Sequence, residues 1–478
     1  MDSNNYSTYV SPLSTRYASF EMQHLFSEEY KFKTFRKLWV YLAEAEKELG
    51  LDITDEQINE LKANQDNLNL DVAKEREKIV KHDVMAQIYA YGLQCPHAKG
   101  IIHLGATSCY VDDNTDMIIM KEASKIILSK LSQVLFNLKR FALKYKDLPC
   151  LSYTHLQPAQ MTTMGKRATL WMNELVIDIN NLAYQVDNLR PLGCKGTTGT
   201  QASFMDLFQG NEKEVKRLDD LIIKKMGFKK AIMVSGQTYT RKEDSYLLNC
   251  LAGIASSAYK FSNDLRILQS FREIEEPFEK DQVGSSAMPY KRNPMRAERM
   301  SGLSRYVIIN SLNSDFTSGT QFLERTLDDS ANRRLTISEC FLGVDAILNI
   351  YINITDGLVV NKKVIAKRVS DNLPFMATEN IMMEAVKKGG DRQVLHERLR
   401  EYSQKTADEV KDGKDNHLLE IIQNDQLFNL SQKEIQAIIN PTKFTGRSSS
   451  QTKEFIHEEV DPIIRKFHKK EIQEQLNV

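Results

Sequence analysis

The sequence predicts an all-α protein built around a bundle of long helices. Three segments carry apolar residues at alternating spacings of four and three, which places each set on one face of a helix in a near-parallel bundle. Prolines fall between or after these stripes and none lies strictly inside one, as expected of uninterrupted helices. Strand signals are few, and residues 229–234 are the best candidate. The three stripes are Ile127, Leu131, Val134, Leu138, Phe141 and Tyr145; Ala168, Met172, Leu175, Ile179, Leu182, Val186 and Leu189; and Leu247, Leu251, Ile254, Ala258, Phe261, Leu265 and Leu268.

Changes in composition along the chain predict three domains. Residues 1–107 are helical in pattern but more broken, and residues 71–91 there mix charged and apolar side chains. Residues 108–360 hold the long helices of the central bundle. From about residue 361 the chain is rich in lysine, glutamate and asparagine, which predicts a smaller helical domain over residues 361–478. Because helices this long exceed what one chain needs for its own core, we expect a homo-oligomer that shares them.

The charge balance argues against a nucleic-acid-binding surface as the main role. Lysine plus arginine equals aspartate plus glutamate, 64 each, so the formal net charge is zero and only a local basic pocket for a phosphorylated metabolite fits. Six scattered cysteines form no Cys-x-x-Cys pair, which favours a reducing compartment without a disulfide framework. No signal-peptide pattern and no apolar run long enough to span a membrane are visible, so we expect a cytoplasmic protein with no membrane partner.

The histidines indicate acid–base chemistry rather than metal binding. None of the nine has the spacing of a helical metal pair, so we predict no metal and no cofactor. Most histidines in proteins are surface or structural residues. His155, between Thr154 and Leu156, lies in a polar turn that leads into the second predicted helix, and His82 lies beside Asp83. A histidine at the mouth of a long helix is well placed to donate a proton, which makes His155 the stronger candidate.

The loop over residues 284–294 carries the strongest chemical signal. It reads Gly-Ser-Ser-Ala-Met-Pro-Tyr-Lys-Arg-Asn-Pro, with Ser285 and Ser286 behind a glycine and Lys291 near the closing prolines. Hydroxyls on a flexible loop beside positive charge suit removal of a proton and stabilisation of the resulting anion. The residues by themselves predict a catalytic loop without choosing between the two serines.

The start of the first long helix is suited to binding a carboxylate. Thr107 and Ser108 follow Gly105 there, and their hydroxyls and amides could hold an anion at the helix N-terminus. The alternative is structural, with Asp112 or Asp113 as the helix cap.

Residues 325–334 predict a phosphate-binding segment. They bring three arginines and Ser330 into ten positions, and the planar fork of arginine matches phosphate oxygens. The alternative is a solvated, charged helix start. A glycine-rich segment at residues 193–203 lacks the Gly-Lys-Ser/Thr ending of a nucleotide P-loop, so we expect only a loop of backbone amides and hydroxyls there.

The loop at residues 284–294 resembles the signature loop of the aspartase/fumarase superfamily. Its Ala-Met-Pro-Tyr-Lys-Arg-Asn-Pro version is similar to the adenylosuccinate lyase family, close to animal-type members, and the resemblance runs from residues 14–17 to residues 444–447. It implies a three-domain all-α fold whose central bundle is shared in a homotetramer, with sites that draw on three subunits. It also implies β-elimination of fumarate in purine biosynthesis, from adenylosuccinate to give AMP and from the succinylated carboxamide ribotide SAICAR to give AICAR.

The resemblance assigns a role to each candidate residue. Ser285, rather than Ser286, would be the general base, and His155 would be the general acid that protonates the leaving nitrogen. His82 would orient the succinyl group and His155, and Lys291 would stabilise the developing charge. The residues that bind the carboxylates, the phosphate and the rest of the substrate would be Arg16, Tyr17, Lys81, His82, Asp83, Thr107, Ser108, Thr154, Gln237, Lys291, Asn293, Arg299, Arg325, Ser330 and Arg334.

One position departs from the family pattern, and two alternatives remain. Where animal-type members are expected to carry Arg-His-Asp, residues 81–83 read Lys-His-Asp, so the charge is kept but the bidentate fork is lost. Another superfamily lyase, such as argininosuccinate lyase or fumarase, would act on a substrate without phosphate and would not need residues 325–334. A non-catalytic helical scaffold would not need Ser285, His155 and Lys291.

Overall fold

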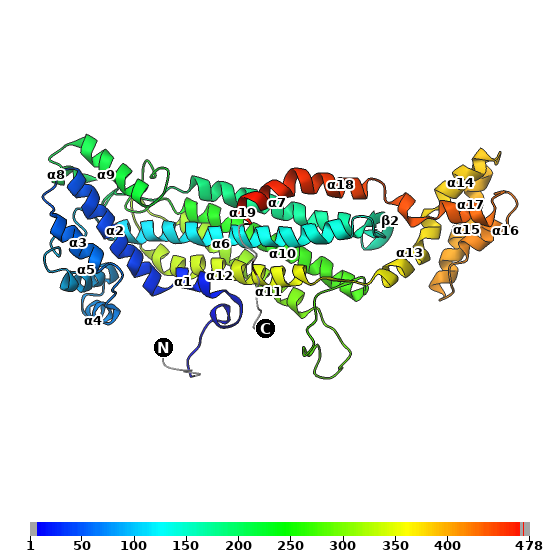
Figure 1. The fold of residues 1–478 in the computed structure, drawn as a ribbon, viewed down its shortest axis with the longest axis horizontal. Helices are drawn as coiled ribbons and strands as arrows, with labels where there is room; N and C mark the ends of the chain where they lie inside the picture. Colours follow the sequence, from blue (N-terminus) through cyan, green and yellow to red (C-terminus); the bar gives the residue numbers. More distant parts are fainter. Residues whose placement is uncertain (1–6, 469–471, 473–478) are drawn as a thin grey trace.

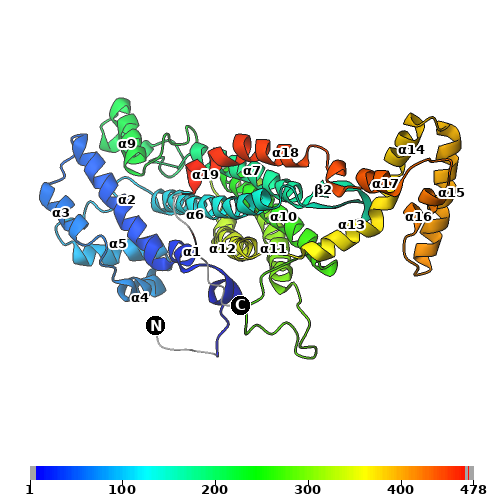
Figure 2. The same ribbon diagram turned by 45° about the vertical axis from the view of Figure 1, so that its right-hand side comes forward.

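The computed structural model describes residues 7–468 and 472 and is an elongated, mostly helical molecule. A bundle of long helices forms its middle, and a smaller group of helices lies at each end (Figures 1 and 2). The predicted all-α class is confirmed.

Five long helices form the central bundle. They are α6 (Ser108–Lys144), α7 (Met164–Asn188), α10 (Lys242–Ser270), α11 (Met295–Gly319) and α12 (Asp328–Asp356). The three predicted stripes lie on α6, α7 and α10, except that Tyr145 and Leu189 directly follow α6 and α7. They supply much of the bundle core, which confirms them. The Phe261 ring stacks on Tyr351, with ring centres 4.4 Å apart, and makes a T-shaped contact with Trp171, with ring centres 5.0 Å apart. Aromatic packing thus joins α7, α10 and α12.

The helix α12 corrects one expectation from the sequence. Every residue from 340 to 352 is buried, and a helix buried on all sides shows no apolar stripe, which is why periodicity did not predict it. The same composition makes the prediction that no apolar run could span a membrane wrong. By length and composition α12 could cross one, but 83% of its most apolar stretch is buried inside the bundle.

A second group of helices packs at one end of the bundle around Trp39 and Phe204. It contains α2 (Glu28–Glu48), α3 (Asp55–Ala63), α4 (Leu70–Val80), α5 (Asp83–Gln94), α8 (Ala202–Leu207) and α9 (Glu212–Lys225). The helical pattern of residues 71–91 is interrupted because Lys81 adopts a left-handed conformation with φ 55° and His82 begins the next helix. Two short elements, η1 (Leu13–Tyr17) and α1 (Phe20–Leu25), lie against α12, and α1 also contacts α6.

A β-hairpin stands where the sequence predicted only a polar turn. Strands β1 (Pro149–Thr154) and β2 (Gln157–Thr163) pair antiparallel between α6 and α7. The two residues of its turn, His155 and Leu156, have φ of 53° and 59°. Left-handed geometry at both positions matches the twist of a two-residue hairpin but is strained for residues other than glycine.

The predicted strand at residues 229–234 is wrong. This segment has no regular structure, because none of the described strands pairs with it. The side chains of Met233 and Val234 are exposed. A second, shorter antiparallel pair is formed by β3 (Ile274–Glu275) and β4 (Val359–Val360).

The rest of the chain forms the third group and then returns to the bundle. Its elements are α13 (Lys362–Met376), α14 (Thr378–Lys387), α15 (Arg392–Lys411), α16 (Leu418–Asn424), α17 (Gln432–Ile438), η2 (Pro441–Phe444), α18 (Ser448–Phe455), η3 (Ile456–Val460) and α19 (Asp461–Phe467). Ile381, Leu399 and Phe428 belong to a core of their own. Val460 and Ile463 instead pack into the bundle core. The division into domains at residues 108 and 361 stays a prediction.

Candidate active site

The structure brings eight of the predicted site residues together where α6 and α12 begin. The Ser108 hydroxyl lies 3.4 Å from His82 Nε2, and Arg334 donates to the Asp83 carboxylate over 2.9 Å. Cys109 follows Ser108, and its Sγ lies 3.7 Å from Gln237 Oε1. We call this group the α6–α12 cluster; its members are His82, Asp83, Thr107, Ser108, Gln237, Arg325, Ser330 and Arg334. Lys81 is exposed beside His82.

His82 is oriented by its place at the start of α5. Its Nδ1 accepts from the Met85 amide at 3.5 Å, so the proton of the neutral ring lies on Nε2, which faces Ser108. The imidazole is nearly half exposed and is open to a ligand from solvent.

The start of α6 overturns the structural alternative for its aspartates. Neither Asp112 nor Asp113 caps the helix: Thr107 is the N-cap residue, and its side chain makes no cap hydrogen bond. The first-turn amides of a helix are free donors and attract anions. This end of α6 can therefore hold a carboxylate, as the sequence indicated.

A buried ionic network that the sequence did not reveal holds Arg325. Arg241 donates to both oxygens of Asp113 at 3.1 Å and to Asp329 at 2.8 Å, and all three side chains are buried. Asp329 also accepts from Arg325 at 3.0 Å through each oxygen. Because Asp329 is fixed from behind by Arg241, it fixes the Arg325 guanidinium in turn. Arg241 is far from Asp113 and Asp329 along the chain, so no local pattern marks the network.

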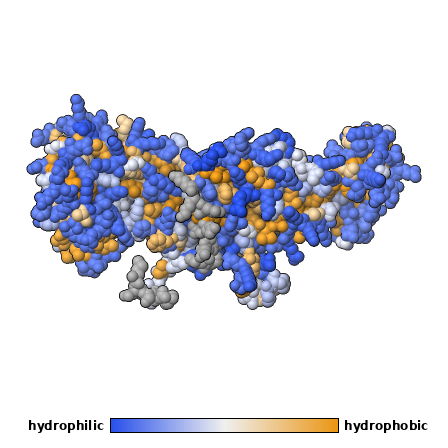
Figure 3. All heavy atoms as spheres, in the orientation of Figure 1, coloured by the Kyte–Doolittle hydropathy of each residue, from blue (hydrophilic) through white to orange (hydrophobic). Residues whose placement is uncertain are grey.

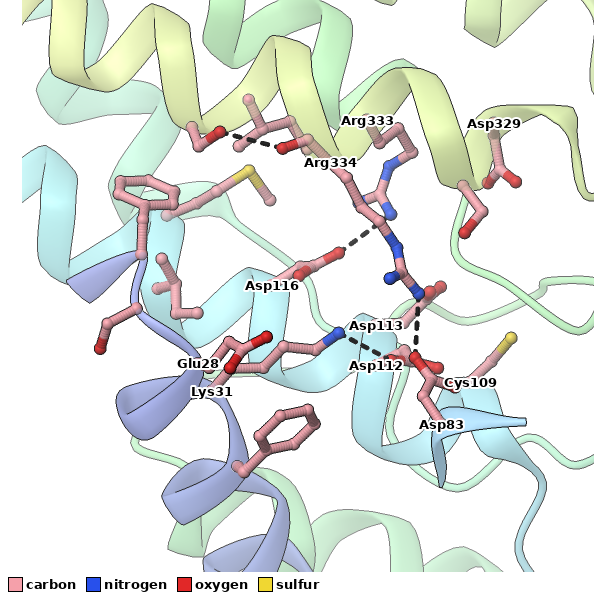
Figure 4. Close-up of a pocket in the computed structure, with 18 of the residues that line it drawn as sticks. Glu28, Lys31, Asp83, Cys109, Asp112, Asp113, Asp116, Asp329, Arg333 and Arg334 are labelled. Carbon is pink, nitrogen blue, oxygen red and sulfur yellow. Dashed lines mark hydrogen bonds and ion pairs between the residues drawn. The ribbon is translucent and has the colours of Figure 1, made fainter. Parts of the chain in front are cut away.

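A cavity of about 340 Å³ lies behind the cluster, and both acidic and basic side chains line it. Figure 4 shows Lys31 directed to Asp112 and Arg334 directed to Asp83. Burial raises the pKa of Asp112 to about 7, although Lys31 opposes the shift. Burial would also raise the pKa of Asp83, but Lys31, the Val84 amide and Arg334 together lower it. Since Arg334 is 61% exposed, its guanidinium at the rim is open to a phosphate from solvent.

Within the loop, the two serines have different surroundings. The Ser285 hydroxyl oxygen accepts from the Ala287 amide at 3.3 Å and from the Met288 amide at 3.1 Å, whereas Ser286 is exposed. Two amide donors aimed at one oxygen stabilise negative charge on it. This arrangement can favour an alkoxide at Ser285.

The base of the loop is tied down on both sides. Gln269 donates to the Arg292 carbonyl at 3.1 Å and accepts from the Glu276 amide at 3.0 Å. Asn293, a predicted substrate ligand, donates to the Gly284 carbonyl at 2.7 Å and so closes the loop on itself. Lys291 is exposed above this closure.

Arg299 lies just beyond the loop, on α11. It is partly buried, and its charge acts on Glu276, although burial still raises the pKa of that carboxyl group. The structure thus places Arg299 at the loop base rather than in the α6–α12 cluster.

His155 and Thr154 lie at the exposed tip of the hairpin. The strand below the tip is held by Glu273, which accepts from the Tyr153 hydroxyl at 3.1 Å and from Arg368 at 2.9 Å. Because the tip is exposed, His155 is open to a partner outside its own hairpin.

Within one chain, the hairpin tip and the loop at residues 284–294 both lie far from the α6–α12 cluster. The hairpin follows the C-terminal end of α6, and Ser108 stands at the N-terminal end of its 37 residues, a separation of about 55 Å at ~1.5 Å per residue. The loop base contacts Gln269 at one end of α10, whereas Arg241 precedes the other end, about 43 Å away by the same measure. Arg16 and Tyr17 lie on η1, against the side of α12.

Two family models match the chain. The one described as Lyase matches residues 37–309, and the one described as Adenylosuccinate lyase C-terminus matches residues 374–455. Among the solved structures that share the fold are two enzymes of low sequence identity to this chain. The 3-carboxy-cis,cis-muconate lactonizing enzyme from Pseudomonas putida has a TM-score of 0.82 at 19% identity and covers 95% of this chain and 99% of its own. The fumarate lyase from Mesorhizobium sp. BNC1 has a TM-score of 0.78 at 18% identity, with 96% and 99% covered.

Full-length relatives narrow the family. The adenylosuccinate lyase of Saccharomyces cerevisiae is 48% identical over 471 residues, which cover 97% of each chain. That of Schistosoma mansoni is 45% identical over 467 residues, again 97% of each. That of Pyrococcus abyssi is 30% identical over 445 residues, 92% of this chain and 95% of its own. The chain therefore belongs to the adenylosuccinate lyase family, as the signature loop indicated.

Proposed function

We propose that the chain eliminates fumarate from adenylosuccinate, leaving AMP, and from SAICAR, leaving AICAR. The observation that carries the proposal is the α6–α12 cluster, in which Arg325, Ser330 and Arg334 lie beside the His82–Ser108 pair. A substrate with a phosphate and carboxylates matches this combination of a basic rim and free helix amides. A substrate without phosphate would leave the arginines unused.

In the first step, Ser285 as its alkoxide removes a proton from the carbon next to a substrate carboxylate. The electron pair of that C–H bond moves toward the carboxylate, where a second negative charge develops. Acid and base groups contribute roughly 10²–10⁴-fold each, and enzyme accelerations run from ~10⁶-fold upward, so the developing charge must be stabilised as well. Lys291, carried on the same loop as Ser285, is the side chain that we assign to this role.

In the second step, the bond between carbon and nitrogen breaks. The electron pair returns from the carboxylate to form the double bond of fumarate, and the nitrogen leaves with the pair of the broken bond. His155 gives its proton to that nitrogen, and His82 orients the succinyl group. The hairpin presents His155 at an exposed tip, which suits a group that reaches into a site formed elsewhere.

The substrate would be held by residues from each place. Thr107, Ser108, Gln237 and Asn293 would contact the carboxylates, while Arg16, Tyr17, Arg325, Ser330 and Arg334 would surround the phosphate. The remaining contacts would come from Lys81, Asp83, Thr154, Lys291 and Arg299. Lys81 would act as a point charge rather than a bidentate fork.

We also propose that each site is shared between subunits of a homotetramer. Within one chain, about 55 Å along α6 separates His155 from the α6–α12 cluster, and about 43 Å along α10 separates the loop that carries Ser285 from it. Apolar side chains are also exposed over the middle of the bundle on the face that Figure 3 shows. Surfaces of this kind are usually covered by a partner. The exposed large apolar and aromatic side chains on α7 and α11 are Leu170, Ile177, Tyr184, Tyr306, Ile309, Leu312 and Phe316.

A reducing, cytoplasmic setting fits this proposal. All six cysteines are free, and five of them are buried. Among the described residues, no group of three or more histidine, cysteine, aspartate or glutamate side chains is arranged to hold a metal ion.

The decisive experiment is absorbance-monitored turnover of adenylosuccinate beside argininosuccinate and malate. We expect turnover of the first alone.

Ser285→Ala should lower kcat by on the order of 10³-fold, since a general base is removed, with an unchanged melting temperature. Ser286→Ala is the matched control and should retain activity within about tenfold, because its hydroxyl lacks the amide donors. Near-normal fumarate release by Ser285→Ala would reject Ser285 as the base.

A further inference from the structure

We propose that a buried group of three side chains, Lys130, Asp345 and Asn349, positions Arg16 and Tyr17 for the phosphate of the substrate. We call it the Lys130 group. The inference rests on the proposed function, because it takes Arg16 and Tyr17 as phosphate ligands. None of the three side chains reaches a reacting atom, so their role is positioning.

The Lys130 group lies inside the bundle, between α6 and α12. Lys130 Nζ lies 2.7 Å from Asp345 Oδ1 and also donates to Asn349 Oδ1, and all three side chains are at most 3% exposed. Desolvation makes a buried ion pair a poor way to hold two helices together, since apolar residues of similar volume do so as well or better. Holding the two helices together therefore does not explain why Lys130 and Asp345 are buried as a charged pair.

The Lys130 group also binds the backbone of the N-terminal segment, which gives the buried charges a role. Asp345 Oδ2 accepts from the Ser19 amide at 2.6 Å, and Asn349 Nδ2 donates to the Tyr17 carbonyl at 3.1 Å. These two bonds stand on either side of Ala18 and fix the peptide that joins η1 to α1. The Arg16 guanidinium lies 5.9 Å from the centre of the Tyr17 ring, so the fixed backbone also orients the two candidate ligands.

The position of the Lys130 group along α12 matches the phosphate end of the site. Ser338 lines the cavity behind the α6–α12 cluster, and Asp345 follows it by two turns, about 10 Å. The Lys130 group thus connects the bundle interior with the segment that would complete the phosphate site.

A single substitution can remove the hydrogen bond from the Ser19 amide to Asp345. Ser19→Pro removes the amide proton that Asp345 accepts, and Ser19 already has φ −66° and ψ 153°, which proline adopts without strain. Ala18 before it is extended, with φ −78° and ψ 146°, as a residue preceding proline should be. Ser19→Ala is the matched control, because both variants lose the hydroxyl that caps α1 but only the proline variant loses the amide.

Two substrates separate positioning from general damage: adenylosuccinate and the same nucleoside without its phosphate. We expect Ser19→Pro to raise KM for adenylosuccinate about tenfold over Ser19→Ala, the effect of losing one hydrogen bond to a charged group. For the phosphate-free substrate, kcat/KM of the two variants should agree within about twofold, since the contact that is lost concerns phosphate alone. Equal losses on both substrates, or no loss on either, would overturn the inference.

A second variant covers the case in which Ser19→Pro does not fold. Asn349→Ala removes the bond to the Tyr17 carbonyl and should show the same dependence on phosphate; a loss independent of phosphate would count against the Lys130 group. Wild-type chains that fail to cleave adenylosuccinate would reject the proposed function instead. The two failures are therefore distinct.

Discussion

At the scale of single residues, surroundings rather than residue type separate candidates from bystanders. Ser285 and Ser286 are chemically identical neighbours, yet only the Ser285 oxygen receives the amides of Ala287 and Met288. The sequence alone left the two serines equal, and the resemblance chose Ser285. The structure adds a physical reason that supports this choice, because amide donors favour the alkoxide over the hydroxyl.

A buried carboxyl group outside the site leads to a prediction about pH. Glu46 on α2 is fully buried, and among the described residues neither of its side-chain oxygens has a hydrogen-bond partner. Burial raises its pKa to about 9 from an ordinary value of 4.5. Between these values the folded chain keeps a proton that the unfolded chain has released. The native state binds more protons, so stability falls as pH rises through this range.

Glu46→Gln should therefore be more stable than wild type at high pH. The neutral amide has no proton to lose, so its advantage should grow with pH by up to about 1.4 kcal/mol per unit between roughly pH 5 and pH 8. Denaturation curves at both pH values measure the difference. The control is Glu48→Gln, at an exposed position on the same helix. An advantage that does not change with pH would show that Glu46 is ionised in the folded chain.

At the scale of elements, each candidate catalytic group is carried on a connection between helices. The loop follows α10, the hairpin follows α6, and His82 begins α5 after a left-handed residue. The long helices are scaffold, and their stripes are predictable because burial on one face leaves a period in the sequence. Loops and turns lack such a period. Sequence motifs can mark their chemistry, but periodicity does not predict their conformation.

The closed base of the loop predicts a steric effect at Gly284. A Cβ added there would lie 2.1 Å from the Lys291 carbonyl oxygen, so one strand of the loop must move. Gly284→Ala should lower kcat by about 10²-fold or more, since displacements near 1 Å at catalytic groups have this effect. The melting temperature should change little, because the part of the loop that must move, residues 286–292, is exposed. Gly100→Ala is the control, as no atom lies within 4 Å of its added Cβ. Normal turnover by Gly284→Ala would show that the closure does not govern Ser285.

At the scale of the whole molecule, the proposal of shared sites predicts rescue between inactive chains. Ser285→Ala and His155→Ala should each be inactive alone. If the two residues of one site come from different subunits, random mixing at equal amounts leaves about a quarter of the sites intact. Activity should therefore recover toward about a quarter of the wild-type value after subunits exchange and reassemble.

The matched control mixes His155→Ala with chains that carry both substitutions, where no site can regain Ser285 and His155 together in this way. Differently tagged chains recovered in one complex verify the exchange. Verified exchange without any recovery would place both residues of a site on the same subunit.

The sequence by itself determined the helical class, the three striped helices, the signature loop and its family. These features are local: a stripe or a motif lies within a few turns of chain, so physical chemistry can interpret it without a fold. Only the tertiary structure decided the rest. It revealed α12, which is buried on all sides, the hairpin in place of a turn, and the absent strand at residues 229–234. It also joined Arg241 to Asp329 and Lys130 to Asp345 and separated His155 from the α6–α12 cluster, because these relations connect residues that are distant in the chain and leave no period in it.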